Sequence, residues 1–296
     1  MKKRIFTGAG VALITPMNAD GSINWDKLGK LIEFHIENQT DALIICGTTG
    51  ESATLTDYEH LKCIYYAVEK ANGRIPVVAG ASSNDTSYAM MLARESKQAG
   101  ADGILCVTPY YNKASQRGLI KHYNMIADTT DLPMILYNVP SRTGCNILPE
   151  TYLELSKHPN IVATKEANGN IISVAKTREL CGDALDIYSG DDDQIVPIMS
   201  LGGIGVISVL SNILPRETHD ICQLFFDGKI KESSDLQISM ISMVGALFCD
   251  VNPIPVKAAM NMMGWDVGEC RMPLCETSPE NLKFIESQLR LHKLIK

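Results

Sequence analysis

Lys165 follows a short apolar run, where its amine could act as a nucleophile. Period-two alternation along residues 161–164 places the lysine side chain on the same face as Ala163 and Ile161. If that face lines a buried interior, the surroundings disfavour the ammonium form and lower the lysine pKa, so the neutral amine can attack a ketone. The alternative is an ion pair with Glu166 or another nearby carboxylate, and the lysine alone does not decide between the two.

Tyr137 ends the apolar run that precedes the run of Lys165. Adjacent strands of a sheet lie about 4.8 Å apart, so the phenol and the amine can meet if the two runs are neighbouring strands. A tyrosine beside a carbinolamine can shuttle protons during imine formation and carbon–carbon bond formation. The alternative is a structural tyrosine whose ring only packs.

Two further segments could hold a carboxylate. GTTGES (residues 47–52) supplies two glycines that permit a tight turn, the hydroxyls of Thr48 and Thr49, and several backbone N–H groups. It is not a phosphate loop, because GxxxxGK[ST] is absent. Arg142 in YNVPSRTG can bind a carboxylate in bidentate fashion, although an arginine after a strand is more often part of a surface ion pair.

The acidic run Asp191, Asp192 and Asp193 raises the question of a metal site. No His cluster or second group of carboxylates accompanies it, so we interpret these residues as caps of a helix over QIVPIM. Cys270 and Cys275 are a close pair of cysteines without a CxxC spacing or a His-rich partner. The sequence therefore predicts no metal.

These residues need a scaffold that brings strand ends together. Short apolar, β-branched runs recur roughly every thirty residues and indicate strands buried on both faces, as in a parallel sheet. Helical patterns alternate with them, for example after the capping box Thr56 and Glu59 and after Leu148-Pro149-Glu150. The runs are VALITP, ALIICG, IPVVAG, GILCVTP, LPMILYNVP, IVATKEA, LDIYSGDD and GIGVISVL.

Eight alternating units match a closed (β/α)8 TIM barrel better than an open doubly wound sheet, which usually has five or six strands. In barrel enzymes the active site lies at the carboxyl ends of the strands, so we expect GTTGES, TPYYN, YNVPSRTG and TKEANG to meet there. After residue 211 the pattern is helical, near residues 214–227, 230–248, 254–263 and 279–293, and Ser278-Pro279-Glu280 opens the last helix. We interpret residues 1–229 as the barrel that carries the active site and residues 230–296 as a C-terminal helical extension packed on it.

Composition excludes several classes of protein. A chain of 296 residues with 45% hydrophobic and 21% charged residues can bury a large core. A net charge of −7 with dispersed Lys and Arg does not fit nucleic-acid binding. No signal peptide and no apolar stretch long enough for a membrane is expected, and nine cysteines scattered through apolar segments are typical of a reducing compartment, which favours the cytoplasm. The cysteines expected in the core include Cys46, Cys63, Cys106, Cys222 and Cys249.

Taken together, GTTGES, TPYY, YNVPSRTG, the strand lysine and YSGDD resemble the pyruvate-dependent class I aldolase superfamily, which includes N-acetylneuraminate lyase and dihydrodipicolinate synthase. The resemblance covers essentially the whole chain. Within the superfamily the chain resembles the dihydrodipicolinate synthase family, on the Thr48-Thr49 pair and on Arg142. That family implies a carbon–oxygen lyase that condenses pyruvate with L-aspartate 4-semialdehyde in diaminopimelate and lysine biosynthesis, through a Schiff base and without a metal or dissociable cofactor.

The resemblance also implies residue roles. Lys165 would form the imine, and Tyr137 would relay protons through Thr48 to Tyr111. Tyr111 would cross a tight dimer interface into the neighbouring subunit's site, in a homotetramer built as a dimer of dimers. The substrate-binding residues implied are Thr49 and the backbones of Gly190 and Ile207 for pyruvate, and Arg142 for the carboxylate of the aldehyde substrate.

Many members of the family are inhibited by lysine at the tight dimer interface, and this chain matches part of that site. Tyr88 stands where inhibited members usually carry a glutamate, which would hold the ammonium group of the effector. Loss of such a charge-assisted contact removes about 1.5–3 kcal/mol, so we expect weak or absent lysine inhibition. The candidate allosteric residues are Ser52, Ala53, His60, Asn84, Tyr88 and Tyr110.

Two other functions remain open at the level of sequence. Another aldolase of the superfamily could cleave a sialic acid or a 2-keto-3-deoxy sugar acid with the same lysine and tyrosine. Arg142 argues against it, because a polyol substrate needs neutral hydrogen-bonding groups rather than a fixed cation. A non-catalytic barrel that senses a small 2-oxo acid or amino acid would not need Lys165, Tyr137 and Tyr111 together.

Overall fold

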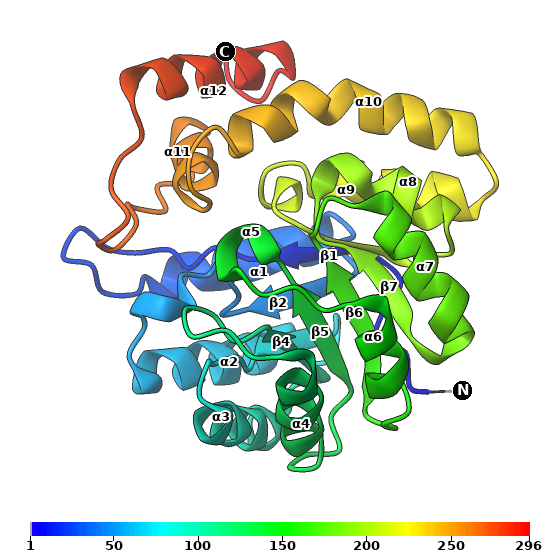
Figure 1. Ribbon diagram of the computed structural model, residues 1–296. Helices are drawn as coiled ribbons and strands as arrows, with labels where there is room; N and C mark the ends of the chain where they lie inside the picture. Colours follow the sequence, from blue (N-terminus) through cyan, green and yellow to red (C-terminus); the bar gives the residue numbers. More distant parts are fainter. Residues whose placement is uncertain (1) are drawn as a thin grey trace.

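The computed structural model describes residues 2–296 and shows a closed barrel of eight parallel strands (Figure 1). Each strand pairs with the next along the chain, and β8 closes the barrel against β1. The predicted (β/α)8 fold is therefore confirmed. Seven of the eight predicted apolar runs contain a whole strand, whereas VALITP overlaps only the last two residues of β1, which begins at Gly8. Met1, where the predicted barrel segment begins, lies outside the described residues. The strands are β1 (Gly8–Ala12), β2 (Ala42–Ile45), β3 (Val77–Gly80), β4 (Gly103–Val107), β5 (Met134–Asn138), β6 (Ile161–Glu166), β7 (Asp186–Ser189) and β8 (Gly205–Ser208).

Helices surround the barrel and continue after the last strand. The four helices expected beyond residue 211 lie within about two residues of their predicted bounds. The α-helices are α1 (Trp25–Glu37), α2 (Asp57–Ala71), α3 (Thr86–Gln98), α4 (Gln116–Ala127), α5 (Pro140–Thr143), α6 (Pro149–Leu155), α7 (Ile171–Cys181), α8 (Ile195–Ser200), α9 (Pro215–Phe226), α10 (Ile230–Leu247), α11 (Ile254–Met262) and α12 (Pro279–Leu291). Short 3₁₀ helices are η1 (Ser52–Thr54), η2 (Gly182–Ala184), η3 (Asp192–Gln194) and η4 (Leu210–Asn212).

The predicted helix starts have the expected local chemistry. Thr56 and Glu59 form the capping box of α2, in which the Thr56 hydroxyl accepts from the Glu59 N–H and the Glu59 carboxylate accepts from the Thr56 N–H. Pro149 occupies the first turn of α6, where its missing N–H costs nothing. Ser278 caps α12 by accepting from the Asn281 N–H.

The interior of the barrel corrects one prediction about the lysine strand. The register of β5 against β6 shifts, so that Met134 pairs with Ile161 but Ile135 pairs with Ala163. This irregularity turns Ile161 outward, into the cluster beneath the helices, whereas Ala163 lies in the inner cluster with Tyr137. The expectation that Ile161 shares the face of Lys165 is wrong, and for Ala163 it is confirmed.

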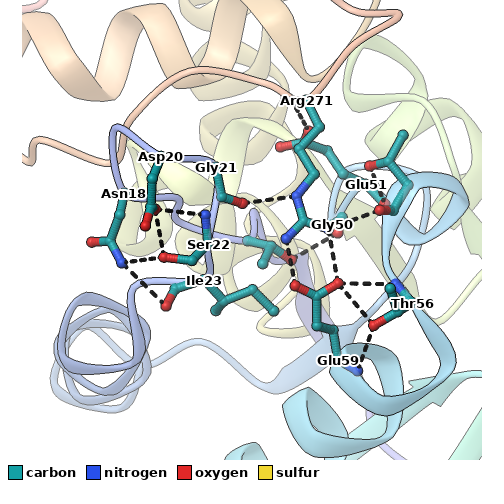
Figure 2. Close-up of polar contacts among 12 residues, drawn as sticks. Asn18, Asp20, Gly21, Ser22, Ile23, Gly50, Glu51, Thr56, Glu59 and Arg271 are labelled. Atoms are coloured by element: carbon teal, nitrogen blue, oxygen red, sulfur yellow. Dashed lines mark hydrogen bonds and ion pairs between the residues drawn. The ribbon is translucent and has the colours of Figure 1, made fainter.

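The C-terminal helices α10, α11 and α12 pack on one another on one side of the barrel, and α10 lies against α9 (Figure 1). Polar contacts also join this part of the chain to the barrel loops. Figure 2 shows Arg271, which follows α11, donating to the Gly21 carbonyl and to the Glu59 carboxylate at the start of α2. The division at residue 229 stays a prediction, and these contacts describe an extension anchored to the barrel.

Two predictions from composition can be compared with the structure. Among residues 2–296, no helix is long and apolar enough to cross a membrane. All nine cysteines are free. Four of the five named as core residues are buried, whereas Cys249 is only partly buried.

Candidate active site

Lys165 and Tyr137 are cross-strand neighbours at the carboxyl end of the barrel. Register pairs the two residues directly, and the Lys165 Nζ lies 4.3 Å from the centre of the Tyr137 ring. Both side chains are buried, with exposed fractions of 5% and 6%. The fold therefore brings the Lys165 amine against the Tyr137 side chain, as predicted.

The environment of Lys165 favours its neutral form. Burial lowers the pKa of Lys165 to about 8, while Asp192 and Asp191 oppose that shift and Arg142 supports it. Above that pH most of the amine is neutral and can attack a carbonyl carbon. Burial similarly raises the pKa of Tyr137 to about 12, partly offset by Arg142 and by a hydrogen bond with Thr48, so the phenol keeps its proton at neutral pH.

Glu166 is not the partner of Lys165. Its side chain leaves the opposite face of β6 and accepts hydrogen bonds from the Tyr152 hydroxyl at 2.9 Å and from the Asn138 amide at 2.9 Å. Burial raises the pKa of Glu166 to about 8, against the effect of these donors. The ion-pair interpretation of the lysine with its sequence neighbour is therefore wrong.

The other fully buried lysine, Lys257, shows what a structural lysine looks like in this chain. Its Nζ lies 2.8 Å from the Glu51 carboxylate and also donates to the carbonyls of Glu269 and Thr15. All three ammonium donors are thus used, in an ion pair whose side chains are 2% and 1% exposed. Among residues 2–296, Lys165 has no such set of hydrogen-bond and ion-pair partners, which makes it the candidate for the reactive lysine.

A cavity of about 510 Å³ opens beside Tyr137. Thr48, Tyr137 and Arg142 line it together with Tyr110, so GTTGES, YNVPSRTG and TPYYN converge as predicted. The fourth predicted segment, TKEANG with Lys165, is not among the residues that line the cavity. Arg142 is exposed, and Pro140 in the first turn of the short helix α5 helps to fix the start of the segment that carries it. A hydroxyl, a phenol and a guanidinium facing one cavity fit a small carboxylate-bearing substrate.

The remaining predicted substrate-binding residues are not among those that line the cavity. Thr49 is buried, and the Ile207 side chain belongs to the inner cluster of the barrel. Gly190 follows β7, and a Cβ at this position would lie 3.1 Å from Lys165 Cε and 2.7 Å from the Ala167 side chain. Only glycine lets the backbone pass this close to the lysine.

Tyr111 is not brought into the site by the single chain. Its side chain is 93% exposed, and its backbone has φ +68°, a left-handed conformation that is uncommon for a tyrosine. Its neighbour Tyr110 does line the cavity. A relay from Tyr137 to Tyr111 therefore requires a second subunit.

The candidate allosteric residues lie on the same cavity as the active-site residues. Asn84 is the exception, and its side-chain amide donates to the Tyr110 carbonyl at 3.2 Å. The Tyr88 hydroxyl donates to the Asp57 carboxylate at 2.6 Å, and burial raises the pKa of Tyr88 to about 12. The residues of this group that line the cavity are Ser52, Ala53, His60, Tyr88 and Tyr110.

The aspartate run does not act as predicted. None of the three caps α8 through its side chain; instead buried Asp192 accepts from the backbone N–H groups of Val209 and Leu210 at the start of η4. The capping interpretation is wrong because the backbone N–H groups that Asp192 binds belong to the start of η4, which follows β8, and not to α8. Within residues 2–296, no three His, Cys, Asp or Glu side chains are grouped as a metal site requires.

Sequence reasoning missed the contribution of the C-terminal extension to the cavity. Val251, Asn252, Pro273 and Leu274 all line it, although none belongs to the barrel. Asn252 donates to the hydroxyl of Thr49 at 3.0 Å. An Asn-Pro pair between two helices signals only a turn, so no local pattern marks it as part of a site.

Comparison with known proteins gives a consistent result. The sequence profile of the Dihydrodipicolinate synthetase family matches residues 5–291. A 4-hydroxy-tetrahydrodipicolinate synthase of Lachnoclostridium phytofermentans is 55% identical over 292 residues, which cover 98% of this chain and 99% of that protein. The dihydrodipicolinate synthase structure from Aquifex aeolicus aligns with a TM-score of 0.95 at 43% identity, over 98% of this chain and 99% of the other. A chloride-inhibited dihydrodipicolinate synthase from Acinetobacter baumannii, solved with pyruvate, aligns with a TM-score of 0.96 at 38% identity, over 99% and 100% of the two chains.

Proposed function

The chain belongs to the dihydrodipicolinate synthetase family, and from this membership we propose how its own residues carry out the reaction. It condenses pyruvate with L-aspartate 4-semialdehyde to 4-hydroxy-tetrahydrodipicolinate, a step of lysine biosynthesis. The sugar-acid aldolase and the non-catalytic sensor both lose support, because relatives above 50% identity over the whole chain are named as this synthase.

The chemistry begins at Lys165. Its neutral amine attacks the ketone carbon of pyruvate, and loss of water leaves an imine whose positive charge, when protonated, draws electrons from the neighbouring methyl group. Loss of a methyl proton gives the enamine that attacks the aldehyde carbon of the second substrate. Tyr137 is the group placed to donate and accept these protons, and Thr48 connects it to the cavity.

The observation that carries this proposal is the contrast between two buried lysines. Lys257 is held by a carboxylate and two carbonyls, whereas Lys165 faces a phenol ring at 4.3 Å, and burial lowers its pKa. A lysine kept neutral beside a proton donor is suited to imine formation. We assign pyruvate's carboxylate to Thr49 and the Gly190 and Ile207 backbones, and the aldehyde substrate's carboxylate to Arg142.

Tyr137→Phe tests the proton relay. We expect kcat/KM with pyruvate and aspartate semialdehyde to fall about 10²-fold, because the ring and its packing remain while the proton donor is lost. The matched control is Tyr123→Phe, which removes another buried phenol, one that lies in the cluster beneath the helices and is not among the residues that line the cavity. Equal activity of the two variants in a steady-state assay would remove Tyr137 from the mechanism.

The exposed Tyr111 supports the proposal that the site is completed in an oligomer, a homotetramer built as a dimer of dimers. A tyrosine with 93% exposure and a left-handed backbone gains burial only if a second copy covers it. Tyr111 then donates into the partner's relay. Sedimentation velocity at assay concentration measures the oligomeric state, and an active monomer would contradict the proposal.

The nine unpaired cysteines support a cytoplasmic location, which cell fractionation tests.

Lysine is expected to inhibit this enzyme weakly or not at all. The Tyr88 hydroxyl already donates to Asp57 and offers no carboxylate to an effector's ammonium group. Loss of that contact costs about 1.5–3 kcal/mol, so we expect half-inhibition only at millimolar lysine or above. Steady-state inhibition assays measure it, with Tyr88→Glu expected to be more sensitive than the wild type. Half-inhibition of the wild type below millimolar lysine would refute the expectation.

A further inference from the structure

Asn252 joins the C-terminal extension to the loop that carries Thr48 and Thr49. It lies between α10 and α11, is 4% exposed, and lines the same cavity as Thr48 and Tyr137. Its side-chain Nδ2 donates to the Thr49 Oγ1 at 3.0 Å. An extension residue thus contacts the hydroxyl to which we assign pyruvate's carboxylate.

The direction of this hydrogen bond determines what Thr49 can do. A threonine hydroxyl has one hydrogen and two lone pairs, and the amide of Asn252 occupies a lone pair. Within residues 2–296, no acceptor takes the Thr49 hydrogen. The hydroxyl is therefore left as a donor, which is the polarity that an anionic carboxylate needs.

The second end of the Asn252 amide is unused. Its Oδ1 is buried and, in the part of the chain that the structure describes, has no hydrogen-bond partner, which is costly for a residue that only joins two segments. The buried amide of Asn212, by contrast, uses both ends: it donates to the Ala12 carbonyl and accepts from the Ile14 N–H. Asn252 makes one side-chain bond, and that bond goes to Thr49.

We propose that Asn252 is a positioning residue that fixes the Thr49 hydroxyl as a donor to the carboxylate of pyruvate. The inference rests on the proposed function, because it assumes that Thr49 binds pyruvate. It makes the C-terminal extension part of pyruvate recognition. It assigns no contact of Asn252 with the aldehyde substrate.

A double-mutant cycle tests the proposal through the pyruvate KM. Asn252→Leu keeps the side-chain size and removes only the one hydrogen bond, so we expect the pyruvate KM to rise about threefold to tenfold. Thr49→Val removes the carboxylate contact itself and should raise it about tenfold or more. Adding Asn252→Leu to Thr49→Val should raise the pyruvate KM no further, because Thr49→Val has already removed the hydrogen bond between Asn252 and Thr49.

The other kinetic constants separate positioning from a general loss of structure. We expect kcat and the KM for aspartate semialdehyde to stay at wild-type values in Asn252→Leu. Thermal unfolding checks that each variant is folded, and Asn252→Ala replaces the leucine variant if that one does not fold. Additive effects of the two substitutions on the pyruvate KM, or a change confined to the KM for the semialdehyde, would overturn the proposal.

Borohydride trapping of pyruvate distinguishes a failure of this inference from a failure of the proposed function. If the wild type traps pyruvate and Asn252→Leu reaches half-maximal trapping at the same pyruvate concentration, Asn252 does not act on Thr49 and the enzyme assignment stands. If the wild type traps no pyruvate, the proposed function fails first.

Discussion

Borohydride reduction in the presence of pyruvate is expected to add one reduced pyruvyl group to the wild type and none to Lys165→Ala. Burial lowers the pKa of Lys165, and within residues 2–296 no carboxylate pairs with its amine, so we expect this amine to form the imine. Intact-protein mass followed by peptide mapping locates the adduct. Steady-state activity of the variant should fall by on the order of 10⁴ or more, the scale seen when a covalent nucleophile is removed.

Two comparisons sharpen this result. Lys176→Ala removes an exposed lysine of α7 and should keep both the adduct and the activity. The rate of adduct formation should rise as the pH increases toward about 8, the lowered pKa of Lys165, and level off above it, because the neutral amine is the reacting form. An adduct on Lys257, or trapping that persists in Lys165→Ala, would mean that the wrong lysine has been assigned.

The barrel and its lysine strand could be predicted because their signals are local. A buried parallel strand needs a continuous apolar run, and a helix start needs a cap, so both are visible in short segments such as residues 161–167. Strand ends then identify the site, since a closed barrel brings all carboxyl ends to one face. That rule alone places Tyr137 beside Lys165.

The errors share a different cause. Ile161 was placed on the inner face because alternation assumes a regular strand, and a single register shift reverses the face of the residue before it. Asp192 was assigned to the helix that follows it in sequence, but it binds backbone N–H groups after β8. In both cases a contact between distant segments decided the outcome.

Asn252 was missed for the same reason. Nothing in residues 251–253 indicates a site, because the partner of Asn252 lies two hundred positions earlier, in GTTGES. Tyr111 is 93% exposed, so the contacts of the single chain assign it no role. Its place in the relay of a partner subunit is implied by the family resemblance and stays a proposal.

Breaking the buried ion pair of Glu51 and Lys257 is expected to lower the free energy of unfolding more than breaking an exposed ion pair does. Lys257→Met leaves the Glu51 carboxylate buried with only the Arg271 N–H as donor, and breaking a buried pair in this way costs about 3–5 kcal/mol. Lys231→Met, which breaks an exposed pair with Asp235, is the control and should cost about 1 kcal/mol or less. Urea unfolding at one protein concentration measures both.

A double variant separates the effect of the unpaired charge on the free energy of unfolding from the effect of lost packing. Glu51→Gln with Lys257→Met removes both charges while the amide can still accept from the Arg271 N–H, so it should be more stable than Lys257→Met alone. If Lys257→Met were as mild as Lys231→Met, the pair would not be buried in solution. Glu51 directly follows Thr48, Thr49 and Gly50 and has φ +57°, so the same ion pair joins the GTTGES loop to Lys257 of α11. If Thr49 binds pyruvate as we propose, the stability of this loop depends on a helix that the barrel fold itself does not require.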